Sequence, residues 1–130
     1  MTLTGNVISQ TVITDKMIDD VLVTAFEGGI NYWCSKVEVA EKNYVGMASG
    51  AISKNCTLFL IEDRSEEGEP DERHLLDRET MISGFRQAIV KFPRLLEELN
   101  DYENMAGVII DAEMADCIVQ LALFDEIIYG

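Results

Sequence analysis

The chain has 130 residues, and its 24 Asp and Glu against 10 Lys and Arg give a formal net charge of -14. A surface of this charge repels nucleic acid and anionic membranes, so we expect no direct binding to DNA, RNA or lipid. The hydrophobic residues, 48% of the total, suffice for one core and exclude a disordered acidic tail for most of the chain. The sequence therefore predicts a single domain over residues 1–130.

Cell compartment and cysteine chemistry are limited by what the sequence lacks. No apolar run approaches the roughly 20 residues of a membrane-spanning helix, and the N-terminus MTLTGNVISQ has neither the basic nor the apolar region of a secretory signal. We expect the protein to stay in the cytoplasm of the cell that makes it. Cys34, Cys56 and Cys117 form no Cys-x-x-Cys pair, so we expect free thiols rather than a disulfide framework or a zinc site.

The first part of the chain predicts a short strand or arm followed by a helix. At 6–14, Val and Ile stand among polar residues, as in a strand. Asp15 is a good N-cap, and the apolar residues after it recur at the spacing of one buried helical face. Gly28 and Gly29 would ordinarily end this helix, but the apolar stripe continues through them to Trp33. We therefore expect one continuous helix, with the glycines allowing another backbone to approach closely.

The next segment has the period of a β-strand. Val37 and Val39 alternate with charged residues. Two further strand-like runs, at 48–53 and 56–61, flank a Lys-Asn pair that suits a hairpin turn. The run at 56–61 is apolar on both faces, which predicts the most buried strand of the sheet.

Residues 62–79 form the most acidic segment, with nine carboxylates and three arginines. Such a segment cannot bury a face, so we expect an exposed loop or hairpin tip. His74, the one histidine of the chain, lies in this segment. We expect it to be a solvated imidazole rather than a general base.

The segment after the acidic residues predicts a helix and a shorter helical turn. Asp77 is a good N-cap for a helix with an apolar stripe, and Pro93 ends or kinks that helix. A short helical turn is expected at 95–99, and a loop at 100–107.

The last segment predicts a central helix. Asp111 is its N-cap, apolar residues cover more than half of its circumference, and Asp125 ends it. Residues 126–130 resemble a strand that ties the C-terminus into the sheet. The elements together predict an α+β fold, a small mainly antiparallel sheet packed against about three helices. Its core is expected to include Phe26, Trp33, Leu58, Phe85, Ile118 and Leu121.

Two segments, 20–33 and 115–130, carry the sequences EGGINYW and ALFDEIIYG. They resemble a family of small phage and prophage proteins of Gram-positive bacteria, whose pattern looks like EGGxxYW near the front and ALFGExxYG at the end. Asp125 stands where that pattern has glycine. The resemblance spans both ends of the chain, whereas the acidic middle departs from the family pattern. It implies a phage accessory protein and no established activity.

Few side chains suggest catalysis, so we expect a protein that is not an enzyme and binds no cofactor or metal. The sequence offers neither a second histidine nor a basic cluster around Cys34 to lower the pKa of its thiol, which favours a buried structural role. The clustered carboxylates lack the spacing of a dedicated calcium loop.

The first functional hypothesis is an acidic surface that imitates the phosphate backbone and occupies a basic groove of a host protein. A duplex carries one charge per roughly 1.7 Å of axis, and a row of carboxylates can approach that density. A phage protein of this kind that disables a host nuclease or a CRISPR effector suits both the charge and the resemblance. Its candidate residues are Glu66, Glu67, Glu69, Asp71 and Glu72 in one run, with Glu97, Glu98, Asp101 and Glu103 in another. The alternative is that these runs only solvate loops.

The second hypothesis is a pocket that captures a small nucleotide-type signal of host defence. Tyr32 and Trp33 would stack on a ring, Glu27 would accept a hydrogen bond, and Arg86 with Lys91 would contact phosphates. Core packing is the alternative for Tyr32 and Trp33. A phage accessory subunit without a defence role is a third hypothesis, and the oligomeric state is left open.

Overall fold

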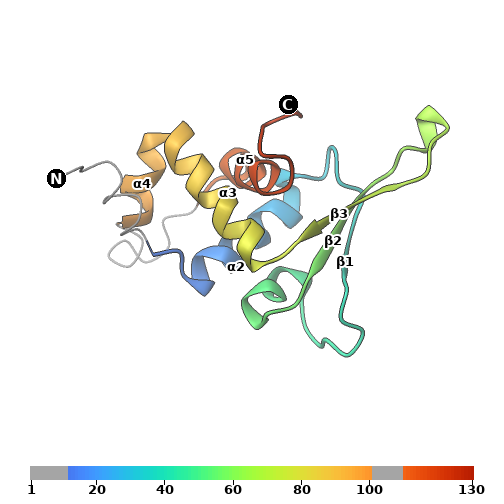
Figure 1. The fold of residues 1–130 in the computed structure, drawn as a ribbon, viewed down its shortest axis with the longest axis horizontal. Helices are drawn as coiled ribbons and strands as arrows, with labels where there is room; N and C mark the ends of the chain where they lie inside the picture. The colour runs from blue at the N-terminus through green and yellow to red at the C-terminus, as the bar shows by residue number, and fades with distance from the viewer. Residues whose placement is uncertain (1–11, 101–109) are drawn as a thin grey trace.

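The computed structural model describes residues 12–100 and 110–130, in which helices pack on one side of a three-stranded sheet (Figure 1). The strands are β1 (Lys36–Val39), β2 (Leu58–Glu62) and β3 (Glu72–Leu76). The helices are α2 (Asp15–Thr24), α3 (Arg78–Lys91), α4 (Pro93–Asn100) and α5 (Ala112–Phe124). This confirms the predicted α+β class with an antiparallel sheet. The expected short turn at 95–99 is a full helix, α4, and brings the helices of the described residues to four.

β2 is the central strand of the sheet, in the order β1-β2-β3, and pairs antiparallel with both neighbours. Leu58 and Leu60 are fully buried and belong to the core that the helices cover. The intervening Phe59 lies under the guanidinium of Arg73, 4.6 Å from the ring centre. The prediction that this run is the most buried strand is confirmed.

The expected strand at 48–53 is wrong. Two short 3-10 turns, Ala48–Gly50 and Ile52–Lys54, occupy it instead. Ala51 and Ile52 are adjacent and both fully buried, whereas neighbouring residues of a strand point to opposite faces. Asn55 has a left-handed backbone, φ 64, and ends the second turn instead of forming a hairpin.

The hairpin of this fold is β2–β3, and its tip is residues 63–71. The tip carries one 3-10 turn, Ser65–Glu67, and projects away from the helices (Figure 1). The expectation of an exposed loop over all of 62–79 is wrong outside this tip, because Glu62 belongs to β2, 72–76 form β3 and α3 begins at Arg78. Glu62 is 7% exposed, and Leu76 is fully buried.

Helix α2 begins one residue earlier than expected, because Thr14 is the N-cap and its hydroxyl accepts a hydrogen bond from the N–H of Met17. The expected continuous helix to Trp33 is wrong. After Thr24 the chain makes one π turn, Ala25–Gly29, and leaves the helix. The close approach predicted at the glycines is confirmed at Gly29, where a Cβ would lie 2.8 Å from the carbonyl oxygen of Ala112.

The helix ends in the second half of the chain follow local side-chain chemistry. Asp77 and Asp111 are N-caps, each accepting a hydrogen bond from a backbone N–H three residues later, and Asp125 ends α5 in a left-handed conformation, φ 58. Pro93 separates α3 from α4. These four predictions are confirmed. The expected C-terminal strand is wrong, since 126–130 form no strand.

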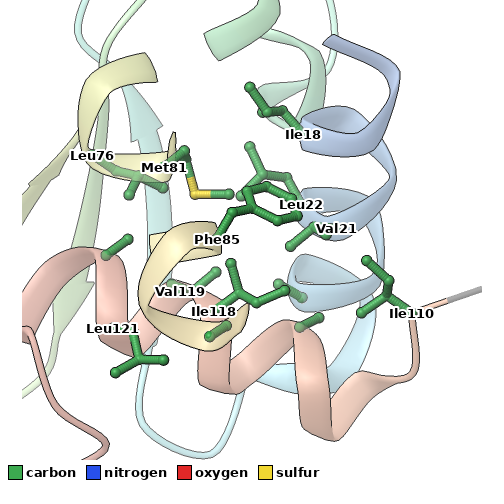
Figure 2. Packing of buried hydrophobic residues seen from close by; sticks show 14 of the residues in the cluster. Ile18, Val21, Leu22, Leu76, Met81, Phe85, Ile110, Ile118, Val119 and Leu121 are labelled. Atoms are coloured by element: carbon green, nitrogen blue, oxygen red, sulfur yellow. The ribbon is translucent and has the colours of Figure 1, made fainter. Parts of the chain in front are cut away.

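Figure 2 shows α2, α3 and α5 converging on one core, to which β3 adds Leu76. Of the expected core residues, Phe26 is only half-buried and packs at the edge, while the other five are buried. Across 12–100 and 110–130, none of the helices combines the length and the apolarity required to cross a membrane. The predictions for residues 6–11 and 101–107 lie outside the described residues.

The contact between α3 and α5 depends on Gly84. A Cβ there would lie 2.6 Å from the carbonyl oxygen of Ile118 and 2.8 Å from the Cβ of Ala122. We expect Gly84→Ala to lower the free energy of unfolding by at least about 1 kcal/mol, because overpacking outweighs the better helix propensity of alanine. Gly50→Ala is the control, since its Cβ meets only the Tyr44 hydroxyl at 3.6 Å. If chemical denaturation shows the same loss of free energy of unfolding for Gly84→Ala and Gly50→Ala, the close contact between α3 and α5 at Gly84 does not limit stability.

Candidate functional site

A buried carboxylate on α5 organises the polar part of the structure. Asp116 is 8% exposed and accepts hydrogen bonds from the indole N–H of Trp33 at 2.8 Å, the hydroxyl of Tyr32 at 2.5 Å and the side-chain amide of Gln120 at 2.9 Å. Tyr32 and Trp33 reach it because the chain leaves the π turn beside the first turn of α5, where Gly29 allows contact. A buried charge with three donors is satisfied.

Gln120 links this carboxylate to the C-terminal segment. It is fully buried and lies one helical turn after Asp116. Its side-chain oxygen, Oε1, accepts hydrogen bonds from the backbone N–H groups of Ile128 at 2.8 Å and Tyr129 at 2.9 Å. The last residues are therefore fixed by a side chain of α5 rather than by strand pairing, which is why the predicted strand is absent.

Tyr129 connects the C-terminal segment to the sheet. Its hydroxyl donates to Glu62 of β2 at 2.5 Å, and the other oxygen of Glu62 lies 2.7 Å from Nε2 of His74 on β3. The Tyr129 ring stacks on Trp33 with 5.4 Å between ring centres, and the His74 ring meets Phe124 edge-on at 4.9 Å. We call the set the C-terminal network. It comprises Tyr32, Trp33, Glu62, His74, Asp116, Gln120 and Tyr129.

The prediction of a solvated His74 is wrong, since its side chain is only 12% exposed. The sequence analysis also missed Glu62, Asp116, Gln120 and Tyr129. A signal for two of them was present: Asp116 and Gln120 are polar residues four apart on a helix that is apolar around most of its circumference. Such residues are buried and need partners.

The network holds its hydroxyl groups in the protonated form. Burial, with a hydrogen bond to Asp116, raises the pKa of Tyr32 to about 12. Burial, with a hydrogen bond to Glu62, raises the pKa of Tyr129 to about 12. Burial also raises the pKa of the Cys34 and Cys117 thiols. None of these four groups is activated as a nucleophile near neutral pH, so the arrangement suits packing and orientation.

One cluster in the described residues brings three metal-ligand atoms within 4.8 Å of one another, from Glu62, Glu72 and His74. Arg64 already supplies a positive charge there, 2.5 Å from Glu72 and 3.7 Å from Glu62. The remaining oxygen of Glu62 and the Nε2 of His74 bond each other. A divalent ion would have to replace these contacts, and nothing else in the structure points to one.

The residues of the expected ligand pocket are not brought together. Trp33 is 8% exposed and belongs to the C-terminal network, which agrees with the alternative of core packing. Tyr32 lines a hollow beside α5, Glu27 lines a cavity beside β1, and Arg86 with Lys91 line a third hollow on α3. No one site therefore combines the aromatic pair with the two cations.

The two acidic runs lie at opposite ends of the molecule, the hairpin tip at one and α4 at the other (Figure 1). The residues of the first run, all exposed, are Glu66, Glu67, Glu69, Asp71 and Glu72. In the second run, Glu97 is exposed and Glu98 half-buried on α4, while Asp101 and Glu103 lie outside the described residues. The chain matches no protein-family model, no curated protein and no solved structure, so the candidate sites rest on geometry alone.

Gln120→Leu should release the C-terminal segment. The substitution keeps the volume but leaves the N–H groups of Ile128 and Tyr129 without an acceptor, and we expect a loss of about 1–3 kcal/mol in the free energy of unfolding. Digestion with a carboxypeptidase should become faster than for the wild type. Gln87→Leu is the control on α3, because its amide bonds the carbonyl of Leu121 and touches no residue after Asp125. If both variants are digested at the wild-type rate, Gln120 does not hold the C-terminus.

The raised tyrosine pKa values predict an alkaline loss of stability. A folded-state pKa of about 12 lies above the ordinary value of about 10, so the folded state holds these protons more tightly. The stabilisation is complete below pH about 10 and is lost as the pH rises toward 12. The free energy of unfolding of the Tyr32→Phe/Tyr129→Phe double variant should fall less steeply over this interval. Tyr44→Phe is the control that keeps both phenols; a wild-type slope in the double variant would contradict the assignment.

Proposed function

We propose that the chain is a non-enzymatic binding protein whose acidic hairpin, residues 63–72, occupies a basic groove of another protein. The observation that carries the proposal is a set of exposed carboxylates that form no ion pair in the part of the chain that the structure describes. These carboxylates belong to Glu66, Glu67, Glu69 and Asp71. Charges that are unpaired within the protein remain available to a positive partner.

The positive charges near the hairpin are engaged at its base. Arg64 bonds Glu72 at 2.5 Å, and Arg73 bonds Glu38 of β1 at 3.0 Å. Their ion pairs therefore leave the four tip carboxylates without a bonded cation. The tip of nine residues, 63–71, holds five carboxylates and one arginine, which supports an imitation of the closely spaced phosphates of nucleic acid.

The base of the acidic hairpin is fixed by the C-terminal network. Glu62, the last residue of β2, lies opposite Glu72 just below the tip, and His74 lies two residues further along β3, opposite Leu60. Glu62 bonds both His74 and Tyr129. At the tip, Gly68 takes a left-handed conformation, φ 72, that favours glycine. A hairpin with a fixed base loses less conformational entropy on binding than a free loop.

The biological setting is part of the same proposal. An acidic protein that enters the nucleic-acid groove of a host nuclease or CRISPR effector would act in the host cytoplasm as an anti-CRISPR-like inhibitor, without binding nucleic acid itself. The net charge and the resemblance to phage proteins support this. Capture of a nucleotide is less favoured, because the five residues expected to form the ligand pocket do not meet in one cavity. An accessory phage subunit remains the alternative role for an acidic hairpin.

The test is a comparison of two charge-matched variants in a pull-down from host lysate. Replacing Glu66, Glu67, Glu69 and Asp71 by Gln or Asn removes four charges from the tip, and we expect partner retention to fall about tenfold with little change in melting temperature. The control removes four exposed charges outside both acidic runs, by the substitutions Asp20→Asn, Glu79→Gln, Glu113→Gln and Glu126→Gln.

Salt and competitor nucleic acid add independent readouts. A charge-based contact should weaken as the salt rises and the Debye length falls to roughly 8 Å, and added duplex DNA should displace a nucleic-acid-binding partner. Equal losses in the two variants would mean that only net charge matters. Retention by the tip variant at the wild-type level, unaffected by salt, would remove the acidic hairpin as the site.

A further inference from the structure

The outer edge of β1 carries backbone groups that no other strand of the described residues uses. On its inner side, the N–H of Ala40 bonds the carbonyl of Thr57 at 2.8 Å. Hydrogen-bonded positions alternate along an antiparallel ladder, so Glu38, two residues earlier, also faces β2. The N–H and C=O groups of Val37 and Val39 therefore face outward. They offer two donors and two acceptors to an additional strand.

A cavity of about 330 Å³ opens beside this edge. Its walls come from α2 and the π turn with Ile30 and Asn31, from residues 34–37 and from residues 47–49, and none comes from β2 or β3. It therefore lies on the free side of β1. Ile30, 1% exposed, and Cys34, 5% exposed, form part of its buried lining. The volume is at the small end of the roughly 300–1,000 Å³ of ligand pockets, and it fits an apolar side chain better than a nucleotide.

The mouth of the cavity is apolar, and no described residue covers it. Met47 is 77% exposed and Val23 38% exposed, and both line the cavity; Val45, two residues before Met47, is 88% exposed. Isolated exposed apolar residues are ordinary, but two in the lining of a cavity, with a third close by in sequence, indicate a contact surface next to the free strand edge. Methionine adapts readily to the shape of an entering group.

The polar groups of the cavity favour a partner that brings hydrogen-bond donors and positive charge. Ser49 is only 8% exposed, lines the cavity and makes no side-chain hydrogen bond within the described residues. The carboxylate of Glu27, also in the lining, has no cation partner there. The one lysine of the lining, Lys36, is paired with Glu38 at 3.0 Å. The charge left over is negative.

We propose that an extended peptide segment of a partner protein adds to β1 as a fourth strand and inserts one large apolar side chain into this cavity. A Lys or Arg of the same segment meets Glu27. Addition of a strand to a sheet edge gives affinity through backbone hydrogen bonds, and the side-chain pocket gives specificity. The proposal is independent of the acidic hairpin, because none of the residues that carry it belongs to 63–72.

The test uses a displayed library of random ten-residue peptides selected on the full chain. Bound sequences should share one large apolar residue, an alternating pattern and a Lys or Arg. Ala48→Phe places a large ring in the cavity and should weaken a selected synthetic peptide by about tenfold or more. The control Val90→Phe adds the same ring at an exposed site on α3, 66% exposed in the wild type, and should leave the affinity unchanged.

Backbone pairing is tested separately, so that the result does not depend on the folding of the cavity variant. In the complex with wild-type protein, hydrogen exchange of the Val37 and Val39 amides should slow about tenfold or more, as expected for newly bonded amides. N-methylation of the peptide residues whose N–H groups face β1 should abolish binding, because it removes the donors of the new strand pairing. N-methylation of the intervening residues, whose N–H groups face away from β1, should not.

Four results would overturn the proposal. The first is a library that yields no binder, and the second is a set of binders that ignore both Ala48→Phe and peptide N-methylation. The third is unchanged exchange at Val37 and Val39 in the complex. A concentration-dependent dimer whose formation protects these two amides would assign the edge to a second copy of the chain and would also overturn it.

Discussion

The burial of one carboxylate, Asp116, is the constraint on which the rest of the structure depends. A buried charge without partners would cost several kcal/mol, so three donors must be held around it. Two of them, Tyr32 and Trp33, come from the segment after the π turn, and the third is Gln120 on the same helix. The path of the chain after α2 is thereby determined by a side chain more than 80 residues later. Gly29 makes this path sterically allowed.

The same constraint extends to the surface where we place binding. Gln120, held against Asp116, fixes the backbone at Tyr129, and Tyr129 fixes Glu62 at the base of the acidic hairpin. A continuous series of hydrogen bonds therefore joins the core of the helical layer to a hairpin that projects from it. Considered without their neighbours, Glu62 and His74 would be candidates for acid–base catalysis or metal binding. In this setting they bond each other and orient a hairpin.

Elements governed by local chemistry could be predicted from the sequence, and elements governed by distant partners could not. The caps at Asp77 and Asp111 depend on a side chain and a backbone group three residues apart, and such chemistry is visible in any window of the sequence. The C-terminal segment has the composition of a strand, but Gln120 already supplies its acceptors. His74 stands among charged residues in sequence and against Phe124 in space. Adjacency in the sequence was the wrong guide to its environment.

The arginines form ion pairs within the folded body of the protein, whereas four carboxylates of the hairpin tip, where we place binding, form none. Arg64, Arg73 and Arg78 form ion pairs at the base of the hairpin, across the sheet, and between α3 and α2. Each exposed pair contributes little to stability, but together they reduce the repulsion expected within a chain of charge -14. The only cation in the hairpin tip, Arg64, is bonded at the base. Repulsion remains among the carboxylates of the tip, where water screens it, and a basic partner would relieve it on binding. The edge of β1 has a different character, since apart from the carboxylate of Glu27 its unused groups are backbone amides and apolar side chains, whose interactions depend little on salt. One small fold thus presents two surfaces that partners would recognise by different physical means.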